Sequence, residues 1–183
     1  MQKINVIAFL VLASAPLMAV AADGTITFNG KVVDKTCTIS TLGGKDFSVT
    51  LPMVPRTVLA SAGAVAGRTP FAINLTKCST GNVATSFEPG SSIDFNTGRL
   101  LNHASANAAA NAAANVQLQL LGSNNQVLPI RAAGAGPAQT NSQWVAVGTD
   151  GSAGLSYYAE YYTTAAATPG AVTSSVKYTI IYR

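Results

Sequence analysis

Hydrophobic and polar residues alternate with a period of two along much of the chain. From Thr25 to Val32 every second position is apolar or glycine, and the alternation recurs from Phe71 to Leu75. This period is typical of a strand that buries one face, and no sustained helical period follows residue 21. The same reasoning predicts further strands at residues 32–39, 47–51, 83–87, 116–121, 143–147, 155–163 and 172–182. Many short strands at this spacing favour a single antiparallel β-sandwich domain.

Two stretches of small residues interrupt the alternation. Residues 104–115 are rich in Ala and Asn, with an asparagine at every fourth position from Asn107 to Asn115. Because alanine favours helix, a short helical turn is an alternative, but we expect a surface loop. Residues 131–142 are rich in Ala and Gly and predict a second exposed loop.

The first 21 residues have the pattern of a secretory signal peptide. Lys3 precedes an apolar run at residues 4–12, and the small residues at 19–21 form a cleavage motif. Ala22 is the expected first mature residue, with Asp23 as the next choice. The apolar run is shorter than the roughly 20 residues that span a bilayer, so a membrane anchor is the less favoured alternative. The mature chain is therefore expected to be secreted.

The chain has two cysteines, Cys37 and Cys78. Behind a secretion signal they most simply form one disulfide, which closes a loop of about 40 residues and stabilises the fold by about 2–4 kcal/mol. Two thiols and the sole histidine, His103, cannot complete a zinc site. We therefore expect no metal and no cofactor.

Charge and the remaining polar residues exclude several classes of function. Without Lys3, ten of the 11 basic residues stand against seven acidic ones, a net charge of about +3, and the basic residues are scattered. This distribution disfavours a nucleic-acid partner. Ser152 lies in a motif that lacks the first glycine of a nucleophile elbow, and no phosphate-binding glycine loop occurs. His103 is expected to be solvated beside the loop at 104–115. Catalysis is therefore the less favoured reading.

The last predicted strand ends the chain in an unusual way. Val176, Tyr178, Ile180 and Tyr182 alternate on one face, and the chain stops one residue later at Arg183. A strand at the end of a protein is ordinary. An aromatic residue at the penultimate position of such a strand in a short secreted chain is more specific.

The first mature strand is unusual in a matching way. Ile26, Phe28, Gly30 and Val32 share one face, with glycine where a bulky residue is expected. A glycine inside a strand marks a bulge or a close approach of another backbone. Either Gly30 is a bulge in an ordinary first strand, or the segment is a detachable strand whose side chains fill pockets on another molecule.

Four stretches together resemble the pilins of the chaperone–usher pathway. They are residues 23–34 followed by Cys37, residues 69–78, residues 87–90 and the ending 178–182. Each stretch is a weak signal, but their combination spans nearly the whole mature chain. The resemblance is strongest to major subunits of enterobacterial fimbriae that carry an N-acetylglucosamine-binding tip adhesin.

The resemblance implies an all-β fold, an incomplete immunoglobulin-like sandwich that lacks its last strand. The missing strand leaves a groove beside the final strand of the chain. A periplasmic chaperone first lends a strand to this groove, and at an outer-membrane usher the N-terminal segment of the next subunit replaces it. The implied organisation is a signal peptide at 1–21, a donor-strand extension at 22–33 and a pilin domain at 34–183.

The resemblance also assigns residue roles and partners. The implied donor face is Ile26, Phe28, Gly30 and Val32. The implied chaperone and acceptor strand carries Val176, Tyr178, Ile180 and Tyr182, with the carboxylate of Arg183 near a basic cleft of the chaperone. Cys37 and Cys78 match the family disulfide. The expected partners are identical subunits arranged head-to-tail in an extracellular fimbria, the chaperone, the usher, and a tip adhesin or adaptor.

Two alternatives within secreted binding proteins stay open. The chain is either a shaft subunit or a minor adaptor, and a single-domain carbohydrate-binding adhesin is a further possibility. Trp144 and the tyrosines at 157, 158, 161 and 162 are residue types that stack on sugars. At alternating strand positions, core and inter-subunit packing is the more favoured role for these aromatic residues.

Overall fold

The computed structural model describes residues 23–24, 26–28, 30, 32, 36–104, 111–131 and 139–183, and the chain divides into two units, Met1–Val33 and Asp34–Arg183. The predicted signal peptide at 1–21 lies outside the described residues. Within the described ranges, no helix is both long and apolar enough to cross a membrane.

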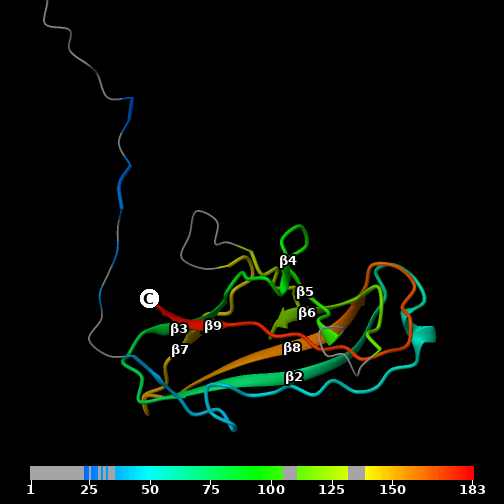
Figure 1. The fold of residues 1–183 in the computed structure, drawn as a ribbon. Coiled ribbons are helices and arrows are strands. Elements are labelled where there is room, and N and C mark those ends of the chain that lie inside the picture. The colour runs from blue at the N-terminus through cyan, green and yellow to red at the C-terminus, as the bar shows by residue number, and fades with distance from the viewer. Residues whose placement is uncertain are drawn as a thin grey trace, which may run out of the picture. The chain divides into compact units, whose positions relative to one another are not determined.

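The larger of two sheets has six antiparallel strands. In spatial order they are β1 (Thr38–Ile39), β2 (Val65–Thr76), β8 (Ala153–Thr163), β6 (Val116–Gly122), β5 (Arg99–Leu101) and β4 (Ile93–Asp94). The long strands β2 and β8 form its centre (Figure 1), and their register places Phe71 opposite Tyr157. Both edge strands of this sheet are only two residues long.

The smaller sheet has three strands, in the order β7 (Val145–Ala146), β3 (Asn82–Phe87) and β9 (Tyr178–Tyr182). The one helix in the described part of the chain is a single 3₁₀ turn, η1 (Arg56–Leu59). The predicted all-β fold is therefore confirmed.

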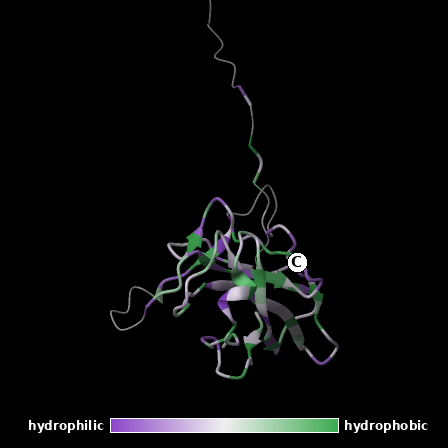
Figure 2. Ribbon diagram, turned by 90° about the vertical axis from the view of Figure 1, so that its right-hand side faces the viewer, coloured by the Kyte–Doolittle hydropathy of each residue, from purple (hydrophilic) through white to green (hydrophobic). Residues whose placement is uncertain are grey.

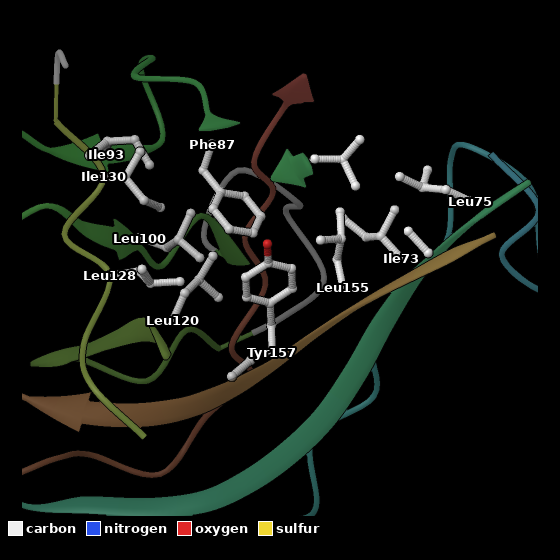
Figure 3. Close-up of a cluster of buried hydrophobic side chains, with 13 residues drawn as sticks. Ile73, Leu75, Phe87, Ile93, Leu100, Leu120, Leu128, Ile130, Leu155 and Tyr157 are labelled. Atoms are coloured by element: carbon white, nitrogen blue, oxygen red, sulfur yellow. The ribbon is translucent and has the colours of Figure 1, made fainter. Parts of the chain in front are cut away.

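The core lies between the two sheets because both turn their alternating apolar residues inward. Ile73 and Leu75 of β2, Leu155 of β8 and Phe87 of β3 are almost fully buried. Tyr157 points from β8 toward Phe87 in the middle of this cluster (Figure 3). In Figure 2 green hydrophobic segments lie beside white and purple ones along the strands of the domain.

Several strand predictions had the wrong limits. β2 is longer than the predicted 71–75, and residues 172–177 form no regular strand although their exposure alternates. Residues 47–51, predicted as a strand, have no ladder partner and belong to no strand. The described residues of 25–32 also have no strand assignment, and positions 25, 29 and 31 lie outside the described residues. β4 and β5 were not predicted.

The predicted surface loops are only partly exposed. In the stretch 104–115, Ala104 and Ala113 are buried and Ala112 bridges to Ala171, while residues 105–110 lie outside the described chain. The approach is close enough that a Cβ atom on Gly170 would lie 2.4 Å from the backbone nitrogen of Ala113. Small side chains are therefore required here by packing, so the expectation of a surface loop is wrong for these positions.

The second predicted loop, 131–142, is likewise not uniformly exposed. Residues 132–138 lie outside the described chain, but Gln139 is buried. Its amide bonds to the backbone of Phe87 at the end of β3.

Candidate functional site

The strand β9 has one paired edge and one open edge. Two backbone hydrogen bonds of 3.0 Å join Asn82 and Arg183. In an antiparallel pair such bonded positions recur at every second residue. The main-chain groups of Tyr178, Ile180 and Tyr182 therefore point away from β3. Across the described ranges no backbone group bonds to them.

The side chains above this open edge form one half-buried apolar row. Val176, Tyr178, Ile180 and Tyr182 all pack against the core, and all four are neither fully buried nor fully exposed. The structure thus brings the four predicted acceptor residues onto one face. A strand added along β9 would both bond to its free main-chain groups and cover this row.

The segment 47–51 faces this row as a second wall. Phe47 and Leu51 pack against the core, whereas Ser48 and Thr50 are exposed, so the segment alternates like a strand. Among the described residues its main chain forms no backbone hydrogen bond. Among the described residues, this wall therefore has no hydrogen-bonding partner, and neither does the open edge of β9.

Two tyrosine hydroxyls join β9 to main chain that precedes the segment 47–51. The hydroxyl of Tyr178 donates to the carbonyl oxygen of Lys45 at 2.8 Å, and that of Tyr182 accepts from the backbone N–H of Cys37 at 3.0 Å. The rings of Phe47 and Tyr178 also touch, with centroids 6.4 Å apart. The two walls therefore come into contact at Tyr178, which makes a narrow point there. Burial, together with nearby Asp46, raises the pKa of Tyr178, so its hydroxyl stays protonated and able to donate.

The predicted disulfide is present at the end of the groove that lies near the C-terminus. Cys37 and Cys78 are bonded with a sequence separation of 41. Because the N–H of Cys37 also binds the Tyr182 hydroxyl, the crosslink holds the start of the domain beside the last strand.

The far edge of β3 is closed, in contrast to the open edge of β9. β7 pairs with β3 at Asn82 and Val83. At Phe87, Gln139 takes the place of a strand: its Oε1 accepts from the Phe87 N–H at 2.8 Å, and its Nε2 donates to the Phe87 carbonyl at 2.6 Å. Sequence reasoning missed Gln139, because nothing in the surrounding Ala/Gly-rich stretch marks a buried polar residue.

The residues of the predicted donor face lie in the other unit. Ile26, Phe28 and Val32 are 78%, 89% and 97% exposed, at every second position and with Gly30 between the last two. A row of apolar side chains held in water is costly, and such rows mark interaction surfaces.

Other candidate residues have structural roles. The guanidinium carbon of Arg183 lies 4.4 Å from the centroid of the Trp144 ring, and that of Arg99 lies 3.5 Å from the centroid of the Tyr162 ring. An arginine therefore already covers the ring face on which a sugar would stack. His103 is half-buried, with its Nε2 buried and unpaired among the described residues, so the expectation of a solvated histidine is wrong. Within the described ranges, no three His, Cys, Asp or Glu residues gather as metal ligands do.

A β-sandwich with one strand edge left open beside its final strand is the architecture of pilin subunits. Comparison with known proteins agrees: the chain belongs to the family of FimA, type-1 fimbrial protein A, whose profile matches residues 51–183. Membership in this family of fimbrial subunits confirms the expectation of a structural protein that is not an enzyme.

Individual relatives extend the match over the rest of the chain. The chain is 82% identical over 171 residues to the major fimbrial subunit SMF-1 of Stenotrophomonas maltophilia, covering 93% of this chain and 99% of the relative. It is 44% identical over 189 residues to the F17 fimbrial protein of Escherichia coli, covering all of both chains.

Solved structures share the fold. A chaperone–usher pilus structure aligns with a TM-score of 0.58 at 21% identity, covering 92% of this chain and 100% of that one. The P pilus rod subunit PapA aligns with a TM-score of 0.55 at 18% identity, covering 80% and 99%. These likenesses confirm the fold as the incomplete immunoglobulin-like sandwich of pilin subunits.

Proposed function

We propose that this structural subunit of an extracellular fimbria polymerises by donor-strand exchange, with residues 22–33 of one copy filling the groove beside β9 of the next. The observation that carries the proposal is a match of two half-sites. β9 has free main-chain groups under a half-buried apolar row, and the N-terminal unit has an exposed apolar row of the same period. The name of the relative SMF-1, a major fimbrial subunit, supports the same role.

Burial of the donor row would supply a large part of the energy of such a contact. Ile26, Phe28 and Val32 are exposed in the single chain and would be covered in the groove. If they bury several hundred square ångströms, about 25 cal/mol per Å² gives on the order of 10 kcal/mol before ordering costs. The free main-chain groups of β9 add hydrogen bonds to this burial.

The position of glycine in the donor row indicates its alignment. Each row has four inward positions, and Gly30 is the third of the donor row. If the two rows align end to end, an antiparallel donor places Gly30 opposite Tyr178, the second acceptor position. A parallel donor places it opposite Ile180, the third. The two walls come into contact where Tyr178 meets Phe47, which leaves little room there. A residue without a side chain fits best at that point, which favours the antiparallel alignment.

The geometry of exchange leads to a filament. Each subunit donates to one neighbour and accepts from another, so the contact is head-to-tail and does not close on itself. An unfilled groove is an aggregation hazard. A periplasmic chaperone would therefore fill the groove first, and the donor strand of the next subunit would replace the chaperone at an outer-membrane usher. The tip adhesin, its N-acetylglucosamine ligand, and the choice between shaft and adaptor stay predictions.

The test compares two proteins that lack the signal peptide. One is the mature chain without residues 23–33. The other is the same chain with a copy of residues 23–33 joined after Arg183 through a flexible linker. We expect a large rise in the urea midpoint with the joined strand. A matched control carries the joined strand with Ile26 and Phe28 both replaced by Asn, and should lose most of the gain. Equal, high midpoints in all three would show a domain that is already complete, and donor-strand exchange would be abandoned.

A further inference from the structure

The domain holds an exposed leucine on a turn near its disulfide. Leu42 is 96% exposed and lies in the turn after β1, where the Gly44 N–H donates to the Thr41 carbonyl at 2.8 Å. The Thr41 hydroxyl accepts from the Asn74 N–H at 2.9 Å, which fastens the turn to β2. β1 directly follows Cys37 of the disulfide. Leu42 is therefore held in water on a well-anchored turn at the disulfide end of the domain.

Two further exposed apolar side chains lie at the opposite end of the domain. Met53 is 100% exposed, and Val58 on η1 is 49% exposed. Val54, next to Met53, packs against a small second core together with Val172, which lies on the approach to β9. In Figure 1 the helical turn η1 is at the other end of the domain from the C-terminus. Met53 and Val58 therefore stand where the wall at 47–51 ends.

The proposed exchange brings these two ends together in neighbouring copies, and this step rests on the proposed function. In the antiparallel alignment Val32 of the donor lies opposite Val176, so the donor chain leaves the groove at that end. Cys37 follows Val32 by five residues, a stretch that spans at most about 18 Å when fully extended. The disulfide end of the donating domain must then lie close to the end of the accepting domain that carries Met53.

We propose that Met53 and Val58 of the accepting subunit form an apolar contact surface for Leu42 of the donating subunit, outside the groove. Each side of this contact is too small to hold two free copies together. Once the donor strand is bound, however, the second contact forms at a high effective concentration, so even a small apolar surface is buried. The contact would fix the angle between successive domains, which the donor strand alone leaves free to bend.

The test follows oxidation of Met53 by hydrogen peroxide, which converts methionine to its sulfoxide and is read from the intact mass. Met1 and Met18 lie in the predicted signal peptide, so Met53 is the one methionine expected in the mature chain. Filaments assembled from the mature chain are compared with the single subunit that lacks residues 23–33 and carries the joined strand after Arg183. In that subunit the groove is filled but no neighbour is present. Because a packed contact excludes water, we expect oxidation to be at least about tenfold slower in the filaments.

Two variants identify what covers Met53. Leu42→Ser removes the apolar side chain of the donating subunit at an exposed position, so filaments of this variant should lose most of the protection. Phe95→Ser is the matched control. It removes an exposed apolar side chain on the turn between β4 and β5, away from both domain ends, and should leave the protection unchanged.

The outcomes separate this contact from strand exchange itself. Equal oxidation of Met53 in wild-type filaments and in the single subunit would overturn the contact and leave donor-strand exchange standing. Full protection of Met53 in Leu42→Ser filaments would do the same, because another surface would then cover it. A mature chain that forms no filaments would overturn both.

Discussion

At the scale of single residues, the core contains a tyrosine whose hydroxyl is unpaired. Tyr157 is 1% exposed. Its hydroxyl and that of Thr85 are both buried, and neither has a hydrogen-bond partner within the described structure. Burial raises the pKa of Tyr157, and nearby Thr85 offsets only part of that effect. An unsatisfied buried hydroxyl costs about 1–3 kcal/mol of stability. The ring of Tyr157 therefore stabilises the core, whereas its hydroxyl oxygen does not.

Removing only that oxygen should therefore be harmless. Tyr157→Phe keeps the ring contacts with Phe71 and Phe87, at centroid distances of 5.6 and 5.3 Å. We expect the free energy of unfolding to stay the same or to rise by about 1 kcal/mol. Tyr157→Ala should lower it by about 3–5 kcal/mol, because it leaves a cavity. Urea titration of the subunit with a joined donor strand measures both. A loss of several kcal/mol in Tyr157→Phe would mean that the hydroxyl has a partner.

A second residue links stability to pH. Asp94 accepts hydrogen bonds from Gln117 Nε2 at 3.1 Å, from the Thr97 hydroxyl at 2.9 Å and from the Asn96 N–H at 3.0 Å. These bonds, that of Gln117 first, lower the pKa of Asp94. Because the folded pKa lies below the unfolded one, the stabilisation is complete above the unfolded value of about 3.9 and is lost as pH falls through the folded value.

Asp94→Asn should therefore be less stable than wild type near neutral pH and should approach it in acid. The measurement is the urea midpoint of both proteins at about pH 7 and about pH 3, on either side of the unfolded pKa. Asp150→Asn is a matched comparison, since hydrogen bonds from Ser152 also lower the pKa of that exposed carboxylate. A gap between Asp94→Asn and wild type that does not change with pH would exclude a titrating role for Asp94.

At the scale of elements, the long strands were predictable because local pattern and tertiary environment agree. β8 alternates between buried and exposed positions over residues 153–157, and one of its faces lies on the core. β4 and β5 have only two and three residues, and their pairing with each other and with β6 defines them, so a periodic pattern had no room to appear.

The incorrectly predicted strand at 47–51 has a different cause. Its apolar period is real, since Phe47 and Leu51 pack on the core. A strand, however, also needs a hydrogen-bonded neighbour, and the described chain supplies none here. The sequence of this segment thus predicted which side chains face the core, but it could not predict the absence of a hydrogen-bonded neighbour. On the opposite side of the small sheet, Gln139 closes the edge of β3 at Phe87. The sequence did not predict this bond, because the two residues are 52 positions apart and meet only in the fold.

The donor strand supplies a prediction at the same scale. Gly30→Leu in a synthetic peptide of residues 22–34 should weaken binding to the chain lacking residues 23–33 by about 10–100-fold, because a side chain would be forced into the narrow point at Tyr178 and Phe47. Fluorescence anisotropy of the labelled peptide measures the affinity.

Two controls identify the cause of the weakening. Thr27→Leu places the same side chain on the opposite face of the donor and should bind like wild type. Phe47→Ala in the accepting chain removes one side of the narrow point and should restore part of the affinity for the Gly30→Leu peptide. Equal binding of Gly30→Leu and wild-type peptides would sink the assignment of the donor face.

At the scale of the whole molecule, the two half-sites are separable. In the proposed exchange, deleting residues 23–33 should leave a subunit that accepts but cannot donate. Joining a second copy of the segment after Arg183, with the original kept, should give one that donates but cannot accept. Each protein should end a growing filament, and each should do so at a different end.

Added to polymerising mature subunit, either protein should shorten the filaments in proportion to its share of the mixture. Filament lengths on negatively stained grids give the measurement. A subunit with both changes, which can neither donate nor accept, is the matched control and should leave the lengths unaltered. Shortening by this doubly changed subunit would point to side-to-side association instead of strand exchange.

In the proposed exchange, the closed edge of β3 sets the valence of the subunit. β7 and Gln139 occupy that edge, and the two outer strands of the larger sheet are too short to template another chain. In the described structure β9 is therefore the one long edge left for a new strand. A building block with one acceptor and one donor has a functionality of two in the polymer chemist's sense. Such units grow into linear chains and cannot branch or gel, however crowded the cell surface becomes.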